Sequence, residues 1–331
     1  MRYYILQVDN EILSLAANTP FAPRVVFNFT SISNGDGMPP SAIIKVYNVV
    51  GYEKLKPEKI KEKQLMFRAG LYKNSLLKKQ KIPETKEDLL FYGKVFAAVQ
   101  SYEGVDSVLT IACSAIKAPS VEGDKKAQRQ VADPNTPVYE QLQKLVEYYV
   151  GEHYTFEISD AAKDVVTNQL QTTPFFNPRR GSGGLNNFFY QANLFNLAVG
   201  YNAKDQIIRI ETIEESLNGN SESKNIELMA NEIISQPVWE TDEEIVVTIG
   251  LKPSIALSDW VILPSNLPLT VSPDSLGSTN FIQNTSNSIL MKGRYKIKAI
   301  QHAGDSRDVN ALNWATTLRL VCQPDESKSS G

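Results

Sequence analysis

Cysteine and histidine are scarce in this chain of 331 residues, which has only two of each. Structural zinc sites draw such ligands from short and regular spacings. Cys113, Cys322, His153 and His302 are instead scattered along the chain. The sequence therefore excludes a zinc site of this type, and we expect no metal ion and no cofactor. Both cysteines lie in apolar, strand-like stretches, so we expect two reduced and buried thiols.

Long hydrophobic runs and an excess of charge are also missing. No stretch approaches the roughly eighteen apolar residues of a membrane-spanning helix, so we expect no membrane span. The opening MRYYILQVDNEILSLAANTP lacks a basic region followed by a long apolar core, so we expect no signal peptide. The net charge is −3, which argues against a protein whose main task is to grip nucleic acid.

The motifs of common catalytic and nucleotide-binding sites are absent as well. The chain has no G-x-S-x-G nucleophile motif. Its glycine-rich stretch NPRRGSGGLNN, residues 177–187, lacks the Lys-Ser/Thr pair of a phosphate-binding loop and the G-x-G-x-x-G spacing of a dinucleotide site. Arg179 and Arg180 in this stretch could contact a phosphate backbone or a neighbouring subunit. We favour a mobile surface loop.

The stretch 293–322 predicts a long β-hairpin. Tyr295, Ile297 and Ala299 alternate with the side chains between them, and Trp314 begins a second alternation. Period-two alternation is typical of strands with one buried face. The stretch HAGDSRDVNALN between the two runs is rich in turn-forming residues and predicts the connecting loop. Arms of seven residues would reach about 24 Å, which suits the wall of a barrel or a large sheet.

His302, Asp305 and Arg307 lie in this expected loop and raise the question of catalysis. A histidine oriented by a carboxylate is the arrangement of a general base. The alternative is a hairpin loop in which Asp305 caps backbone amides and Arg307 pairs locally. Because no nucleophile motif accompanies the histidine, we favour the second interpretation. The candidates for structural or inter-chain contacts are Gly293, His302, Asp305, Arg307, Trp314, Arg179 and Arg180.

The chain divides by pattern into two β-rich ends and a mixed middle. Residues 1–116 carry about six strand-like stretches, typical of a β-barrel or sandwich, and residues 231–325 return to strands. Residues 117–230 contain helical patterns and polar linkers. One of these patterns, TPVYEQLQKLVEYYVG, has a capping threonine, a proline at the first helical position and a terminal glycine. We expect a small α/β insert between two β segments, and a flexible tail at 326–331.

Four stretches of the two β segments carry a family resemblance. SAIIKVYNVVGYEKLKPEKIKEKQLMFRAGLY has a strand, a charged helix and a strand ending near A-G-Y. LLFYGKVFAAVQSYEGVDSVLTIACSA has an apolar strand, a G-x-D turn and a β-branched strand. LKPSIALSDWVILP follows, and the hairpin GRYKIKAIQHAGDSRDVNALNWATTLRLVC closes the chain. In this order they resemble the phage baseplate hub family, also called the late control D or phage protein D family.

The resemblance implies a mainly β fold with two similar tube-like β-barrel domains flanking the α/β insert. It implies a non-enzymatic structural protein of the virion, in the tail baseplate, assembled in the host cytoplasm. The implied partners are two further copies in a homotrimer, a tail tube or distal tail protein above, a spike protein below, and the tape-measure protein in the lumen. Genome DNA would pass through the ring without specific binding.

Two other functions stay open from the residues. A glycan- or receptor-binding tail module would use exposed aromatic side chains such as Tyr190 or Trp260. A peptidoglycan hydrolase or peptidase would use His302 and Asp305. Neither has a supporting motif, so both remain alternatives to the structural role.

Overall fold

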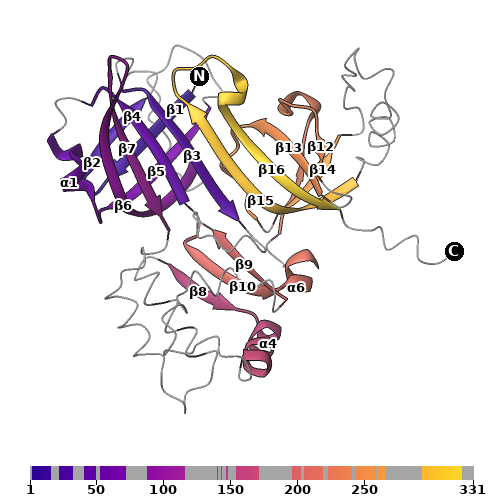
Figure 1. The fold of residues 1–331 in the computed structure, drawn as a ribbon. Helices are drawn as coiled ribbons and strands as arrows, with labels where there is room; N and C mark the ends of the chain where they lie inside the picture. The colour runs from indigo at the N-terminus through magenta and orange to yellow at the C-terminus, as the bar shows by residue number, and fades with distance from the viewer. Residues whose placement is uncertain are drawn as a thin grey trace.

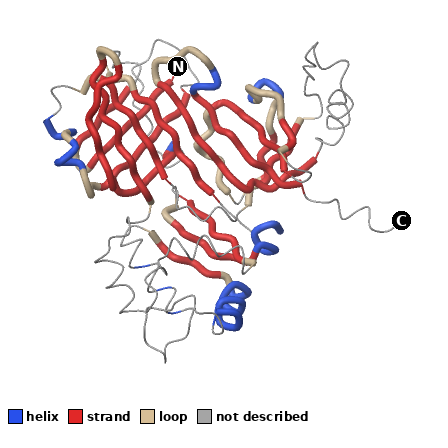
Figure 2. Tube along the Cα trace, viewed as in Figure 1, coloured by secondary structure: helices blue, strands red, loops and turns tan. Residues whose placement is uncertain are grey.

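The computed structural model describes the residues in fifteen ranges or positions. They are 2–15, 22–32, 41–49, 53–71, 88–115, 140, 143, 147, 154–170, 196–202, 205–218, 223–240, 244–257, 259–264 and 293–322. Figures 1 and 2 show a broad, curved β-sheet with a smaller mixed unit below it. The expectation of a mainly β protein is therefore confirmed.

The first β segment supplies seven strands and two short helices. They are β1 (Arg2–Val8), β2 (Glu11–Leu15), β3 (Val25–Ile32), β4 (Ser41–Tyr47), η1 (Glu53–Leu55), α1 (Pro57–Ile60), β5 (Gln64–Leu71), β6 (Leu89–Glu103) and β7 (Asp106–Ser114). Proline at the first position of α1 suits a helix start, because its missing N–H would have no partner there.

The second β segment supplies six strands and two single 3₁₀ turns. They are β11 (Asn225–Glu227), η7 (Ala230–Glu232), β12 (Val238–Trp239), β13 (Glu244–Gly250), β14 (Trp260–Leu263), β15 (Gly293–Asp305), η9 (Ala311–Asn313) and β16 (Trp314–Cys322). β11 precedes residue 231 but pairs with β14 in the large sheet.

Both segments belong to one sheet of thirteen strands. Its main path runs β12-β13-β16-β15-β3-β4-β7-β6-β5-β1-β2, and β14 and β11 branch from β15. The join is the antiparallel pairing of β3 with β15, from Ala299 opposite Ile32 to Asp305 opposite Val26. This sheet is not closed into a barrel, so the two separate barrels expected above are not observed as such.

The two segments nevertheless repeat one strand order. The first contains β3-β4-β7-β6-β5 and the second contains β12-β13-β16-β15-β14. Every neighbouring pair within each unit is antiparallel. In each unit the last two strands along the chain form a long hairpin, β6–β7 or β15–β16. We call these five-strand sets the first and second units.

A β-bulge lies at the same place in both long hairpins. The register shifts between Val95 and Ala97 in β6, and between Ile297 and Ala299 in β15. The extra, bulged residue is Phe96 in β6 and Lys298 in β15. Each strand continues for seven residues after it, to Glu103 and to Asp305. A bulge reverses which alternate side chains face inward. The two units therefore share a specific irregularity as well as an order.

The bulge also corrects two sequence-based expectations. Ala299 was expected on the buried face with Tyr295 and Ile297, but Ile300 is buried there instead, because the extra residue changes the phase. The loop was expected to begin at His302, but β15 continues to Asp305. Turn-forming residues lie in the last part of this strand, where pairing with β3 and β16 overrides their local preference.

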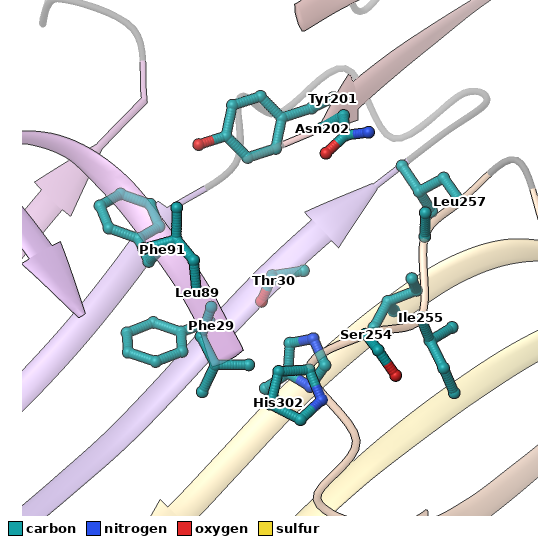
Figure 3. A pocket seen from close by; sticks show the side chains of 14 residues that line it. Phe29, Thr30, Leu89, Phe91, Tyr201, Asn202, Ser254, Ile255, Leu257 and His302 are labelled. Atoms are coloured by element: carbon teal, nitrogen blue, oxygen red, sulfur yellow. The ribbon is translucent and has the colours of Figure 1, made fainter. Parts of the chain in front are cut away.

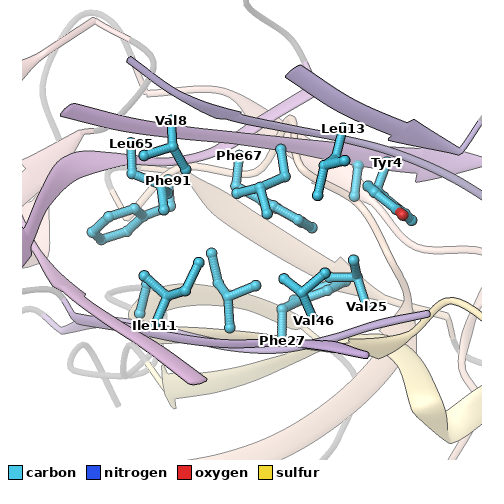
Figure 4. Close-up of a cluster of buried hydrophobic side chains, with 14 of the residues drawn as sticks. Tyr4, Val8, Leu13, Val25, Phe27, Val46, Leu65, Phe67, Phe91 and Ile111 are labelled. Atoms are coloured by element: carbon cyan, nitrogen blue, oxygen red, sulfur yellow. The ribbon is translucent and has the colours of Figure 1, made fainter. Parts of the chain in front are cut away.

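Apolar side chains form two buried cores, one for each segment. The first core fills the space between facing strands of the curled first segment, with Tyr4, Phe27, Phe67 and Phe91 at its centre (Figure 4). The second is built on β13, β14, β15 and β16. Trp314 from β16 is a member of the first core, so the cores meet at the β3–β15 join. Cys113 is buried and reduced, as expected.

The α/β insert forms its own three-stranded sheet. Its elements are β8 (Thr155–Ile158), α4 (Asp160–Leu170), β9 (Leu197–Asn202), β10 (Ile207–Thr212) and α6 (Ile213–Asn218). β10 lies between β8, to which it is parallel, and β9, to which it is antiparallel. Of the helix expected at 136–151, Glu140, Gln143 and Glu147 are described, and they are helical.

Two tyrosines attach the insert to β6. The hydroxyl groups of Tyr154 and Tyr201 lie 2.5 Å apart, and they lie 2.5 and 2.9 Å from the backbone carbonyl oxygen of Tyr92, so two hydroxyl protons link these three oxygens. Burial raises the pKa of both phenols above the usual range, so both remain neutral donors. A shared backbone acceptor fixes the insert to the first segment at one point.

Candidate functional site

His302 is a buried strand residue and not a loop residue. Its side chain is 6% exposed, and its Nδ1 lies 2.9 Å from the Oγ1 of Thr316 on β16. Burial lowers the pKa of His302 to about 3, because a charged imidazole would lose its hydration there. The ring is therefore neutral at physiological pH. A group with so low a pKa is a weak general base near neutrality.

A small pocket adjoins His302 where three parts of the protein meet (Figure 3). Phe29 reaches it from β3, Tyr201 from β9, and Ile255 from the segment after β13. Its lining is mostly apolar. This position makes the pocket a packing junction between the two β segments and the insert.

Asp305 is occupied by a guanidinium group. The Nε and a terminal nitrogen of Arg24 donate to its two carboxylate oxygens at 3.1 and 2.5 Å. The backbone N–H of Arg307 also donates to Oδ1, at 3.0 Å. Burial acts to raise the pKa of Asp305, but these hydrogen bonds outweigh it and leave the pKa below its usual value. The carboxylate therefore remains charged and paired.

Arg307 and Arg2 close the same corner from two other directions. The Arg307 guanidinium donates to the Ala22 carbonyl at 2.7 Å. Arg2, on β1, donates to the backbone carbonyls of Asp305, Asp308 and Asn310. The end of β15, the chain before β3, and the start of β1 are thus held together. We call Arg2, Arg24, Asp305 and Arg307 the arginine corner.

Trp314 and Gly304 form the apolar floor of this corner. Trp314 is buried, and its ring meets that of Phe27 edge to face at a centroid distance of 5.2 Å. A Cβ placed on Gly304 would lie 2.4 Å from the Phe27 ring and 2.7 Å from the Trp314 ring. Glycine is required here because no side chain fits between two buried aromatic rings.

The sequence-predicted cluster is thus brought together as a junction of strands. Asp305, Arg307 and Trp314 lie in one corner, and His302 lies on the same strand facing the core. Asp305 accepts a backbone amide, as the structural interpretation expected, but the expected local pairing of the Arg307 side chain is not found: its guanidinium binds the Ala22 carbonyl, and the ion pair of Asp305 is with the distant Arg24. Each side chain of the arginine corner binds a protein partner, and this arrangement offers no paired acid and base for proton transfer.

The remaining candidates divide between described and undescribed residues. Gly293 begins β15 with a φ of 148°, a conformation that favours glycine. Arg179, Arg180, Tyr190 and the glycine-rich stretch lie outside the described residues. No group of three or more His, Cys, Asp or Glu is placed to hold a metal ion in the described ranges. None of the helices described there has the length and apolar character to cross a membrane.

Trp260, offered above as a glycan-binding aromatic, is 2% exposed, so that expectation was wrong. The Arg294 guanidinium lies 4.0 Å and the Lys296 ammonium 4.9 Å from its ring centroid. Burial lowers the pKa of Lys296 to about 8, opposed by Glu211 and Asp259. These cations cover the face that a sugar would need.

The face of the sheet opposite the cores is almost free of charge at its centre. Two register rows cross this face. One is Ala97, Ala112, Ile43, Asn28, Ala303 and Ala315, and the other is Ser114, Ser41, Thr30, Gln301, Thr317 and Thr248. The residues of these two rows carry no charge, although beyond Ser114 the second row continues to Lys94 at the start of β6. We call these two rows the uncharged face.

Two pairs of oppositely charged side chains border the uncharged face. Lys45 binds Glu103 at 2.6 Å beside one row, and Arg319 binds Glu240 at 2.8 Å beside the other. A protein surface usually carries interspersed charges, which keep it soluble. The centre of this face, which crosses both β segments, lacks that mixture of charges.

Several of these features have no signal in the sequence. Arg2 and Arg24 are single arginines about 300 residues from their partners, and Tyr92, Tyr154 and Tyr201 meet from separate segments. Only the register of the folded sheet reveals the uncharged face. The repeated bulge is also invisible, because it depends on which residues stand opposite each other.

Comparisons with known proteins find likenesses in structure alone. No family model matches the sequence, and a search of curated proteins also gives no match. The structure is similar to the 43 kDa tail protein of prophage MuSo2 from Shewanella oneidensis, with a TM-score of 0.49, 9% identity, and 97% of this chain and 98% of that chain covered.

Two further solved structures are similar at the same level. One is the E. coli c3393 protein, described as a component of the type VI secretion system with structural similarity to T4 bacteriophage tail proteins gp27 and gp5; its TM-score is 0.47, with 7% identity and 98% and 77% coverage. The other is a tail protein from Neisseria meningitidis MC58, with a TM-score of 0.47, 8% identity and 97% coverage of each chain. With TM-scores below 0.5, these likenesses carry no argument about the function of this chain.

Proposed function

We propose that this protein is a non-enzymatic structural hub of a phage tail baseplate, in which three copies form a ring between the sixfold tail tube and a threefold spike. The observation that carries the proposal is the repeated unit. One chain contains the same five-strand order twice, with the same bulge in the same hairpin. Three such chains would offer six equivalent units to a sixfold partner and three identical chains to a threefold one.

The uncharged face supplies the wall that such a ring needs. DNA that passes a surface rich in Lys and Arg would release counterions and bind, which would oppose sliding. From β7 to β16 the two register rows contain uncharged side chains, mostly small or polar, and they cross both units. We place this face toward the lumen, where genome DNA and the tape-measure protein would pass.

The basic stretches of the sequence should lie away from that lumen. In the stretch 54–63, Lys54 pairs with Glu11 at 3.1 Å and Lys63 with Asp9 at 3.1 Å, both beside the β1–β2 turn. The second basic stretch, 76–81, lies outside the described residues. The tube or distal tail protein and the spike would meet opposite ends of the ring, and the protein would be part of the virion baseplate.

The test is the symmetry of the assembled particle. Cryo-electron microscopy of tails, or native mass spectrometry of the purified hub layer, should give three copies in a ring with six similar β units around a channel. A monomer, or an even-numbered ring, would overturn the proposal. So would a channel lined by Lys54 and Lys63 in place of the uncharged face.

A further inference from the structure

The second half of β6 is an open strand edge. β5 pairs with β6 only over residues 89–94, and within the described residues no strand pairs with this edge over 97–103. Val99 is 60% exposed and Tyr102 76% exposed. The stretch AAVQSY that forms the edge has no charge and no proline. Proteins usually protect the free edge of a sheet with charged residues or proline. An edge of this length without either therefore indicates a partner strand.

The equivalent edge in the second unit shows what that partner is. β14 pairs with β15 over residues 293–296, as β5 pairs with the start of β6. The remaining edge of β15, 299–305, is covered by β3, the first strand of the first unit. The strand equivalent to β3 in the second unit is β12, at the free end of the sheet's main path. Within the described residues, the edge of β6 over 97–103 and the outer edge of β12 are therefore both left without a neighbouring strand.

We infer that β12 of one copy pairs antiparallel with residues 97–103 of β6 in the next copy, repeating the contact that β3 makes with β15. Such a contact is head-to-tail, joins two different surfaces, and closes into a ring when the rotation allows. The inference rests on the proposed ring and names its joint. The occupant is a second copy of this chain.

The register follows from the repeat. Asn28 and Val238 hold equivalent places, opposite Ile43 in β4 and Val246 in β13. Asn28 lies opposite Ala303, the fifth residue after the bulged residue in β15.

The fifth residue after the bulged residue in β6 is Ser101. Val238 of one copy should therefore lie opposite Ser101 of the next. By the same rule Glu240 should lie opposite Val99.

The backbone of β12 suits this pairing. Glu240 donates its N–H to the Glu244 carbonyl within the sheet, at 2.9 Å. Backbone groups alternate in direction along a strand, so Trp239 presents its N–H and carbonyl to the open side. Pro237 has no N–H, so this ladder is shorter than the β3–β15 ladder. The pairs Val238–Ser101 and Glu240–Val99 are then non-hydrogen-bonded pairs, whose side chains lie closest.

A disulfide test uses the chain as it exists in tails or in the purified assembly. Val238→Cys combined with Ser101→Cys should give covalent dimers and trimers on non-reducing gels after mild oxidation. The matched control combines Val238→Cys with Val309→Cys, because Val309 is 98% exposed but lies at the other hairpin. The control should stay monomeric on the same gel. A trimer by mass that gives no cross-link with the first pair would overturn this joint while leaving the proposed hub intact, and the absence of any trimer would overturn both.

A charge test avoids any dependence on cysteine chemistry. Val99→Glu places a carboxylate opposite Glu240 of the next copy, whereas Val99→Lys places an ammonium there. Like charges directly opposite each other destabilise a strand pair, so Val99→Glu should weaken trimer association about two- to fivefold per joint relative to Val99→Lys. Both variants share one exposed position, so their unfolding midpoints as monomers should agree. Equal association of the two variants would contradict the inferred register.

Discussion

The two long hairpins share a register and a bulge but differ in what surrounds them. The second half of β15 is covered by β3 and held by the arginine corner, and its residues His302 and Asp305 are buried. The second half of β6 and the turn after it are exposed, as Tyr102 and Val105 show. The comparison shows that one backbone design serves once as an interior joint and once as an open edge. The neighbours of a strand, and not its geometry, decide its chemistry.

The two hairpins should differ most in the unfolding free energy that a substitution costs at the sixth residue after the bulged residue. This residue is Gly304 in β15 and Tyr102 in β6. Gly304→Ala would place a methyl group 2.4 Å from the Phe27 ring. That ring cannot move away freely, because it is packed in the first core. Overpacking of this kind costs about 1–3 kcal/mol of unfolding free energy. Chemical denaturation with tryptophan fluorescence measures it.

Tyr102→Ala is the matched control for that change. Tyr102 is 76% exposed, so its truncation should alter the unfolding free energy by no more than about 0.5 kcal/mol. Comparable losses in the two variants would show that the two hairpins are equally constrained.

The second expected difference is in the pH dependence of folding stability. It arises at the fourth residue after the bulged residue, which is His302 in β15 and Gln100 in β6. The pKa of His302 is about 3 in the folded protein, well below that of an unfolded histidine. The unfolded chain therefore binds a proton first as the pH falls, and folding stability falls with it. We expect a loss of about 1.4 kcal/mol between pH 7.5 and 5.5 from this residue alone.

His302→Gln should remove that part of the pH dependence while keeping a polar side chain near Thr316. Denaturation curves of the two proteins at both pH values isolate the effect, because other groups contribute equally to each. The paired change Gln100→His should add no such slope, since an exposed histidine keeps an ordinary pKa. An unchanged slope in His302→Gln would mean that the imidazole is solvated in the folded state.

The sequence predicted the class of structure and the hairpins, but not how they join. Alternation revealed β6, β7, β15 and β16, because each has one face toward a core. It missed the bulges, since an inserted residue changes the phase without a change in composition. It also placed His302 in a loop, because turn-forming residues near it outweighed a pairing with β3 that lies about 270 residues away in the chain.

The candidate site was predicted in its members but not in its partners. Asp305 and Arg307 were expected to pair locally, and Asp305 does accept the Arg307 amide. The stronger partner of Asp305 is Arg24, which no local pattern links to the hairpin. Contacts between distant segments depend on the whole topology, and a single sequence does not encode them in any short pattern.

The smallest expected difference is in the unfolding free energy lost when a carboxylate is replaced by its amide. It concerns the seventh residue after the bulged residue, which is acidic in both hairpins. Asp305 binds Arg24 in a corner where its own side chain is 10% exposed, although that of Arg24 is 42% exposed. Solvent screening at Arg24 reduces the value of this pair, so Asp305→Asn should cost about 1 kcal/mol of unfolding free energy. Glu103, its equivalent, binds Lys45 and Tyr47 at the surface, with 44% of its side chain exposed.

Glu103→Gln should therefore leave the unfolding midpoint nearly unchanged, since an exposed pair gains little from its charge. The pKa of each carboxyl group is below its usual value, so the contribution of each pair is lost as the pH falls through that folded-state pKa. Urea denaturation of both variants at pH 7, with Arg24→Lys as a third variant, separates charge from geometry. Arg24→Lys keeps the positive charge but loses the bidentate hydrogen bonding. If it lowers the unfolding free energy as much as Asp305→Asn does, the bidentate geometry of the guanidinium, and not its charge alone, stabilises the arginine corner.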